Sequence, residues 1–192
     1  MNAQLSQAAT ILEQGRLLCF PTETVYALAC DATNNCAVGD IYNIKARNAN
    51  TALSLLLPSL ETAKLYGIFP EYAKELAKKY WPGALTLVFK KTKYASILAQ
   101  NVSPNNDTIG IRIPNHPLAL AILNNFKSPI VATSANISGQ DSALTYDDVY
   151  KYFGDKVSII KGDGCELKQA STVVDCTGNE PKILRNGSII IK

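Results

Sequence analysis

The chain has 192 residues, of which 47% are hydrophobic and 18% are charged, and its 19 lysines and arginines against 16 acidic residues give a net charge of +3. This length fits one globular domain whose core needs neither disulfides nor metal, and the composition excludes intrinsic disorder. No apolar run reaches the roughly 18 residues of a membrane-spanning helix, and the first residues form an amphipathic pattern rather than a signal peptide. We therefore expect a soluble, cytoplasmic protein.

Rare residue types restrict the chemistry further. The five cysteines include no C-x-x-C pair, so we interpret them as reduced thiols in or near the core rather than as disulfides or zinc ligands. His116 is the single histidine, which excludes most metalloenzyme sites and leaves any Ser/His/Asp triad dependent on that residue. We expect no metal held by the protein's own side chains.

Helical and strand-like periodicity alternate along the chain. In chain order we expect helix 3–14, strand 17–20, helix 38–45, strand 53–57, helices 60–65 and 70–80, strands 85–89 and 109–113, helix 118–124, strand 130–133, helix 145–153, and strands 157–160, 172–174, 183–184 and 189–191. Ser59 and Pro70 mark two helix starts, and Thr145 with Asp148 forms a third as a capping box. The alternation favours one α/β domain over residues 1–192, without linker or repeat.

Polar turns follow several strands, and binding groups collect at such places in open α/β sheets. In Pro21-Thr-Glu-Thr24, two hydroxyls and a carboxylate lie between a strand and an expected apolar turn that ends at Ala27. Thr22 or Thr24 is equally well explained as a simple helix cap.

Two cations lie at the end of the second helix. Lys45 and Arg47 would diverge inside a helix but converge if the chain leaves the helix between them. Such a pair suits a polyphosphate, because guanidinium grips two oxygens and ammonium acts as a point charge. The alternative is that both only stabilise the helix C-terminus.

Two later strands also carry polar groups. Arg112 lies in an apolar strand, where a buried guanidinium needs a carboxylate or phosphate, either internal or from a ligand. His116 is best explained as a turn or helix-start residue. Ser134 and Asn136 follow strand 130–133, where they and exposed backbone N–H groups suit a phosphate. No Walker motif or G-x-G-x-x-G occurs, which excludes the standard P-loop and Rossmann sites.

In order and spacing, these motifs resemble those of the YrdC/TsaC family. The segments concerned are Pro21-Thr-Glu-Thr-Val-Tyr26, Lys45-x-Arg47, Trp81-Pro-Gly83, Gly110-Ile-Arg112-x-Pro114-x-His116-Pro117, Ser134-Ala-Asn136-x-Ser138-Gly139 and Ser171-Thr-Val-Val-Asp175. They extend over nearly the whole chain, whose length is similar to that of the short, single-domain members. The resemblance implies a YrdC-like fold with one twisted, mixed, open sheet, flanking helices and a concave basic ligand cleft.

The resemblance also implies an activity. The family makes L-threonylcarbamoyl-adenylate from L-threonine, bicarbonate or CO2, and ATP, with release of pyrophosphate. This nucleotidyltransferase reaction begins the N6-threonylcarbamoyl modification of adenosine 37 in tRNA. It implies ATP-bound Mg²⁺ as a cofactor, downstream tRNA threonylcarbamoyl-transferase proteins as partners, and tRNA or double-stranded RNA as a further partner. No Asp/Glu cluster identifies Mg²⁺ ligands in this sequence.

Motif by motif, the resemblance implies two sets of binding residues. Those for ATP are Lys45, Arg47, Thr108, Ser134, Asn136, Arg185 and, by a looser match, Thr145. Those for threonine are Arg112, which would hold the carboxylate, with Thr22, Tyr26 and Ser171. Lys45 and Arg47 are expected to be catalytic, because fixed cations stabilise charge that develops on phosphate.

This chain departs from the family pattern at three places. Asn48 and Ala52 stand where prolines are frequent. The segment Ser54-Leu-Leu-Leu57 lacks the histidine with which longer relatives contact threonine.

Two alternative functions stay open at this point. One is a double-stranded RNA or rRNA-binding module without catalysis, although the chain has no arginine-rich stripe or interleaved aromatic platform. The other is a carbamoyl-transfer domain like that of hydrogenase maturation proteins, which fuse it to zinc-finger and acylphosphatase modules that this chain lacks.

Overall fold

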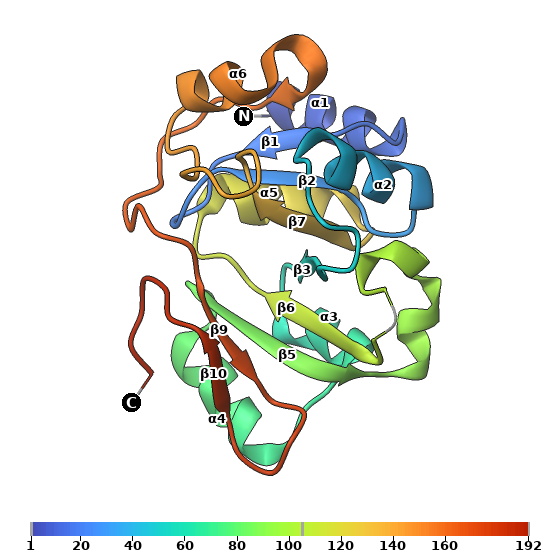
Figure 1. Cartoon of the computed structure of the whole chain (residues 1–192), viewed down its shortest axis with the longest axis vertical. Coiled ribbons are helices and arrows are strands. Elements are labelled where there is room, and N and C mark those ends of the chain that lie inside the picture. The colour runs from blue at the N-terminus through green and yellow to red at the C-terminus, as the bar shows by residue number, and fades with distance from the viewer. Residues whose placement is uncertain (1, 105, 192) are drawn as a thin grey trace.

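The computed structural model describes residues 2–104 and 106–191 (Figure 1). Its strands are β1 (Leu18–Phe20), β2 (Ala27–Asp31), β3 (Ser54–Leu56), β4 (Gly67–Ile68), β5 (Leu85–Lys91), β6 (Thr108–Arg112), β7 (Ile130–Ser134), β8 (Ser158–Ile159), β9 (Thr172–Asp175) and β10 (Lys182–Arg185). Its helices are α1 (Asn2–Glu13), α2 (Asn35–Ile44), α3 (Leu60–Tyr66), α4 (Glu71–Tyr80), α5 (Pro117–Phe126) and α6 (Tyr146–Phe153), with short 3₁₀ turns η1 (Lys93–Ile97), η2 (Gln100–Val102) and η3 (Gly154–Lys156).

One mixed sheet joins the strands in the order β10-β9-β5-β6-β3-β7-β2-β1-β8, and β4 pairs with β5 beside this path. The pairs β3 with β6, β5 with β9 and β1 with β8 are parallel, whereas the others are antiparallel. The expected class, an α/β fold with a mixed sheet flanked by helices, is confirmed. All six expected helices are present, with ends within a few residues of the predicted ones.

Local sequence explains where several helices begin. Ser59 caps α3 by accepting the N–H of Thr62, and Thr145 with Asp148 forms the predicted capping box of α6. His116 caps α5 through its ring and is followed by proline, so its expected role as a helix-start residue is confirmed.

The chain bends at residues 23–25, but the strand that begins at Ala27 was not predicted. Residues Ala27–Asp31 form β2, which pairs with both β1 and β7. The first four residues of β2 are all buried, so the strand lacks the alternation of buried and exposed residues that marks a strand in a sequence.

The expected strand at 189–191 is wrong. The Ile189 carbonyl accepts a hydrogen bond from the Thr172 side chain at 2.6 Å rather than from a neighbouring strand. Ile190 is 80% exposed, so the β-branched run that suggested a strand is not buried in a sheet.

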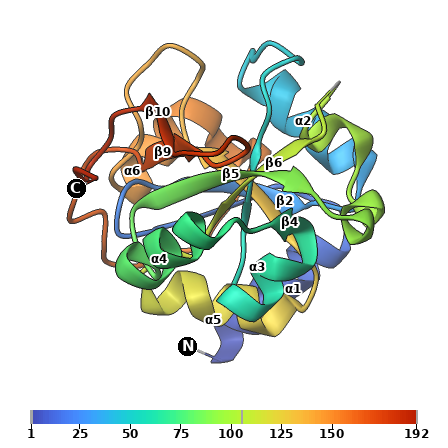
Figure 2. The same cartoon turned by 90° about the horizontal axis from the view of Figure 1, so that it is seen from below.

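Helices cover the sheet unequally. Figure 2 shows α1, α3, α4 and α5 on one side of the strands and α2 on the other. A larger core includes Leu55, Leu87 and Phe89, and a smaller one packs α1 and α5 against β1, β2 and β7. All five cysteines are free thiols and four are buried. None of the described helices is long and apolar enough to cross a membrane.

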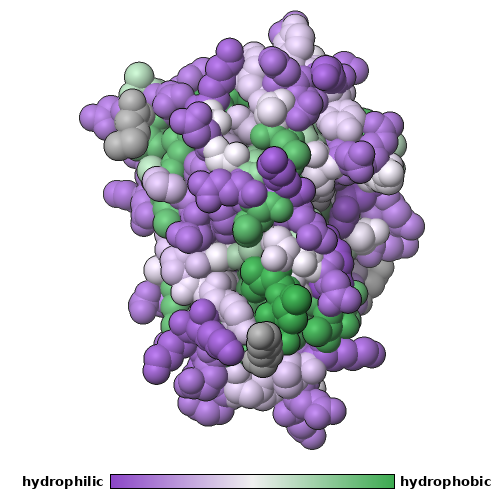
Figure 3. Space-filling view, turned by 90° about the vertical axis from the view of Figure 1, so that its left-hand side faces the viewer, coloured by the Kyte–Doolittle hydropathy of each residue, from purple (hydrophilic) through white to green (hydrophobic). Residues whose placement is uncertain are grey.

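The C-terminal end of the sheet carries an apolar surface. Ile183, Leu184 and Ile190 are exposed by 48%, 54% and 80%. Figure 3, which views the molecule from the left-hand side of Figure 1, shows hydrophobic side chains gathered in its lower half, with hydrophilic ones around them. Leu184 also lines the cavity described next.

Candidate functional site

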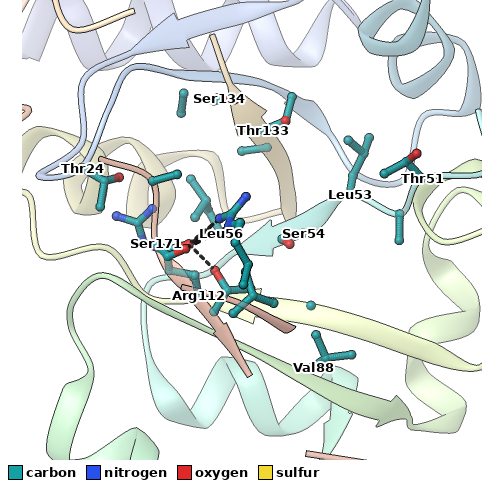
Figure 4. Close-up of a pocket in the computed structure, with 18 of the residues that line it drawn as sticks. Thr24, Thr51, Leu53, Ser54, Leu56, Val88, Arg112, Thr133, Ser134 and Ser171 are labelled. Carbon is teal, nitrogen blue, oxygen red and sulfur yellow. Dashed lines mark hydrogen bonds between the residues drawn. The ribbon is translucent and has the colours of Figure 1, made fainter. Parts of the chain in front are cut away.

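A cavity of roughly 430 Å³ lies over the central strands β3, β5 and β6 (Figure 4). Sheet register places Ser54 beside Gly110 and Gly110 beside Val88, and all three residues line the cavity. A Cβ atom at Gly110 would lie 2.7 Å from Ser54 Oγ. Glycine is therefore what keeps this floor open.

The loop after β1 is held by a dense set of hydrogen bonds. Thr22 Oγ1 accepts the N–H groups of Thr24 and Val25, lies 2.8 Å from Thr24 Oγ1 and donates to the Val25 carbonyl at 2.7 Å. Backbone N–H groups of segment 165–167 donate to the carbonyls of Thr22 and Glu23 at 2.8 and 2.9 Å. Thr22 lines the cavity, but its hydroxyl hydrogen is used within the loop.

The loop is also held through segment 162–164. Tyr26 lines the cavity, its hydroxyl donates to the Gly162 carbonyl at 3.3 Å, and burial raises the pKa of Tyr26. His116 Nδ1 accepts the Ala119 N–H, so its proton lies on Nε2, 2.7 Å from the Asp163 carbonyl. His116 thus links α5 to this segment.

Arg112 has an internal partner. Its Nη2 lies 2.8 Å from Glu23 Oε1, and its Nε donates to the Gly83 carbonyl at 3.1 Å. The motif Trp81-Pro-Gly83 therefore positions a cavity residue, while the Trp81 ring packs edge-on against Phe69. Within the described chain no acceptor engages Arg112 Nη1, which leaves this nitrogen for a ligand.

A polar wall joins β5, β9 and β10. Thr86 Oγ1 lies 2.8 Å from Ser171 Oγ, and Arg185 Nη2 donates to the Ser171 carbonyl at 2.8 Å, with the Ser171 hydroxyl at 3.4 Å. Figure 4 shows these contacts converging on Ser171 beside Arg112. Thr86, Ser171 and Arg185 all line the cavity.

The chain leaves the helix between the two cations that follow α2. Lys45 is the C-cap, and Ala46 has a φ of 48° in the left-handed region. Arg47 then lines the cavity, and its Nη2 donates to the Ala52 carbonyl at 3.1 Å. The loop that lacks the family's prolines is therefore tied to Arg47 through its backbone.

Lys45 itself is 1% exposed and does not line the cavity. Its Nζ donates to the carbonyls of Ser134 and Asn136 at 2.6 and 2.7 Å and to Asn136 Oδ1 at 2.7 Å. Ser134 Oγ donates to the same Oδ1 at 2.7 Å. The structure thus brings these three expected residues together, with Ser134 at the cavity and the other two behind it.

The residues that line the cavity carry charge of one sign, while the Glu23 carboxylate pairs with Arg112 outside the lining. The charged residues among the described lining residues are Arg47, Arg112 and Arg185. Burial lowers the pKa of Arg185, and the charges of Arg112 and Arg47 lower it further. Burial, followed by the charge of Arg47, lowers the pKa of Lys45 to about 8. Cations that destabilise one another in a cavity are suited to an anionic ligand.

The cavity agrees only in part with the expected residue set. Thr22, Tyr26, Arg47, Thr108, Arg112, Ser134, Ser171 and Arg185 line it. Lys45 and Asn136 lie behind its wall, and Thr145 is the cap of α6 outside it. Ser54 and Thr86 also line the cavity and were not among the expected residues. Each is a polar residue between leucines in an apolar strand, and this pattern is the signal that could have indicated them.

Mg²⁺ finds no carboxylate ligands here. Among the described residues no group of three His, Cys, Asp or Glu could hold a metal ion, and the lining includes hydroxyls and arginines but no Asp or Glu. Mg²⁺ prefers carboxylate and phosphate oxygens. The side chains of the site therefore do not fit a protein-held Mg²⁺, and one that arrives with ATP would depend on the phosphates.

Comparisons with known proteins define the class. The sequence model of the Sua5/YciO/YrdC family, described as "Telomere recombination", matches residues 10–187, and the chain belongs to this family. It is 38% identical to the threonylcarbamoyl-AMP synthase of Bacillus subtilis, over 98% of this chain and 54% of that protein.

Solved structures agree. Pyrococcus abyssi Sua5 complexed with L-threonine matches with a TM-score of 0.90 and 37% identity, over 95% of this chain and 54% of that one. Escherichia coli YciO matches with a TM-score of 0.87 and 25% identity, over 97% and 90% of the two chains. The chain spans about half the length of the Bacillus and Pyrococcus proteins.

Proposed function

We propose that this chain is a nucleotidyltransferase that makes L-threonylcarbamoyl-adenylate from L-threonine, bicarbonate or CO2, and ATP, with release of pyrophosphate. The product would enter the N6-threonylcarbamoyl modification of tRNA. The main support for this proposal is a cavity whose charged lining residues are all arginines, in a family whose relatives are named threonylcarbamoyl-AMP synthase. The Pyrococcus relative with this fold was crystallised with L-threonine, which supports the amino acid as substrate.

The geometry suggests how the substrates bind. Arg112 Nη1 is available for the threonine carboxylate, with the hydroxyls of Thr86 and Ser171 beside it. Arg47 and Arg185, which line the same cavity, then remain for the phosphates. A bidentate guanidinium is the best protein match for either anion.

The reaction needs orientation more than a nucleophilic side chain. The threonine amine attacks CO2 and loses a proton, which gives an N-carboxylate. A carboxylate oxygen then attacks the α-phosphorus of ATP, and the bond to pyrophosphate breaks. Orienting the reactants contributes about 7 to 11 kcal/mol in favourable cases, and fixed arginines stabilise the charge on the phosphates.

Isotope transfer tests the proposal. We expect that the protein with ATP, Mg²⁺, L-threonine and ¹³C-bicarbonate yields an adenylate that is one mass unit heavier than the product from ordinary bicarbonate. Absence of any labelled adenylate would overturn the proposal.

Nothing in the described structure favours the RNA-binding alternative. Cytoplasmic location, ATP-bound Mg²⁺ and the downstream tRNA-modifying and RNA partners remain predictions.

A further inference from the structure

Lys45 has no hydrogen left for a ligand. An ammonium group has three N–H bonds, and those of Lys45 meet the Ser134 carbonyl, the Asn136 carbonyl and Asn136 Oδ1 at 2.6 to 2.7 Å. The side chain is buried and does not line the cavity. To contact a phosphate, it would have to give up one of these bonds and cross the wall formed by Ser134.

The same network shapes the loop that follows β7. The Asn136 amide donates to the Gln140 carbonyl at 2.6 Å, and the Ser138 N–H donates to the Lys45 carbonyl at 2.9 Å. Lys45 therefore holds both the start of the loop, through its side chain, and the middle, through its backbone. Only Ser134, at the start of this loop, reaches the cavity among these residues.

We propose that Lys45 is a positioning residue, which fixes loop 134–140 against the nucleotide site without contacting the nucleotide. The proposal rests on the proposed function in taking ATP as the ligand. It replaces the direct phosphate contact expected from the resemblance, and it leaves Arg47, which does line the cavity, as the phosphate contact from this turn.

A double-mutant cycle tests the proposal through ATP dissociation constants. Lys45→Met and Asn136→Leu each weaken binding, and we expect the double variant to bind no worse than the weaker-binding single variant, because both changes release one loop. Arg47→Met is the matched control, because its loss of ATP affinity should multiply with the loss caused by Asn136→Leu. If the losses of ATP affinity in Lys45→Met and Asn136→Leu multiplied in the double variant, the proposal would be overturned.

Hydrogen exchange gives a readout without ligand. Lys45→Met should increase exchange at the Ser138 N–H at least tenfold, as local opening becomes easier. Lys45→Gln, which keeps two donors, serves if the Met variant fails to fold, and it should show a smaller increase. Unchanged exchange in a folded variant would contradict the proposal. Failure of the wild type to bind ATP would contradict the proposed function instead, because exchange does not depend on ATP.

Discussion

Arg112 Nη2 lies 2.8 Å from Glu23 Oε1, and the two side chains are only 9% and 10% exposed. The ion pair joins β6 to the hydrogen-bonded loop after β1. Nε donates a hydrogen bond to the Gly83 carbonyl, whereas the contact of Nη2 with Glu23 is an ion pair without hydrogen-bond geometry, so both of these nitrogens face the protein. The third nitrogen is thereby fixed in direction before any substrate arrives, which reduces the entropy cost of binding a carboxylate.

The first prediction concerns the stability of this pair. Glu23→Gln keeps the shape but leaves the Arg112 charge buried without a counter-charge, and loss of one partner of a buried pair costs about 3 to 5 kcal/mol. Urea unfolding measures the loss. Glu71→Gln is the control, since its pair with Lys74 is 2.6 Å long but exposed by 81% and 44%, and such pairs contribute up to about 1 kcal/mol. Equal losses of unfolding free energy in the two variants would show that the buried pair stabilises the fold no more than the exposed pair does.

The second prediction concerns the cavity floor. Gly110→Ala places a methyl group 2.7 Å from Ser54 Oγ, and overpacking of this kind costs about 1 to 3 kcal/mol. We expect weaker threonine binding by calorimetry, and partial recovery when Ser54→Ala removes the clashing oxygen. Gly178→Ala, whose Cβ would lie 3.9 Å from the Glu180 carbonyl oxygen, should have no effect. Unchanged binding in Gly110→Ala would place the threonine site elsewhere.

The third prediction is a pH dependence. Burial, the charge of Arg47 and, in the opposite direction, Cys19 place the pKa of Lys45 at about 8, below its ordinary value of 10.5. Below pH 8 the ammonium makes all three bonds, and above it one donor is lost, so ATP affinity should fall as pH rises through about 8. Lys45→Arg should remove this dependence because guanidinium stays charged. The exposed Lys78→Arg should retain it. The same dependence in Lys45→Arg would assign the titration to another group.

The fourth prediction concerns the amino acid. Loss of the threonine methyl group, as in serine, should reduce kcat/KM by about 10- to 200-fold, which is the usual discrimination against a substrate that lacks one carbon in a hydrophobic pocket. Valine should be rejected by about 10⁴-fold, because a hydroxyl-bearing lining residue such as Ser54 would lose its hydrogen-bond partner. Competition kinetics compare the three substrates. Comparable turnover of valine would exclude a pocket that recognises the hydroxyl.

Fold prediction from the sequence succeeded where local signals decide the structure. The capping box at Thr145 and the cap at Ser59 are encoded within four residues, so both helix starts were predicted correctly. By contrast, β2 is alanine-rich and buried, and only its two neighbouring strands make it a strand. The run at 189–191 has strand propensity, but no strand of the described sheet is its partner.

Prediction of the site shows the same contrast between local sequence signals and features that only the fold determines. Residue types indicated that Arg112 needs an anion, but only the fold supplies Glu23 from a loop 89 positions earlier, since 112 − 23 = 89. Lys45 and Arg47 looked equivalent in the sequence. A left-handed Ala46 sends one side chain into the protein and the other to the cavity, and no local pattern reveals which.

The most direct test of the central claim is pyrophosphate release from ATP and Mg²⁺, with L-threonine and bicarbonate each added or omitted and RNA absent. The proposed reaction predicts release only when both are present, and its loss in Arg112→Ala with the fold intact. Release without threonine, or without bicarbonate in CO2-free buffer, would contradict synthesis of threonylcarbamoyl-adenylate by this chain.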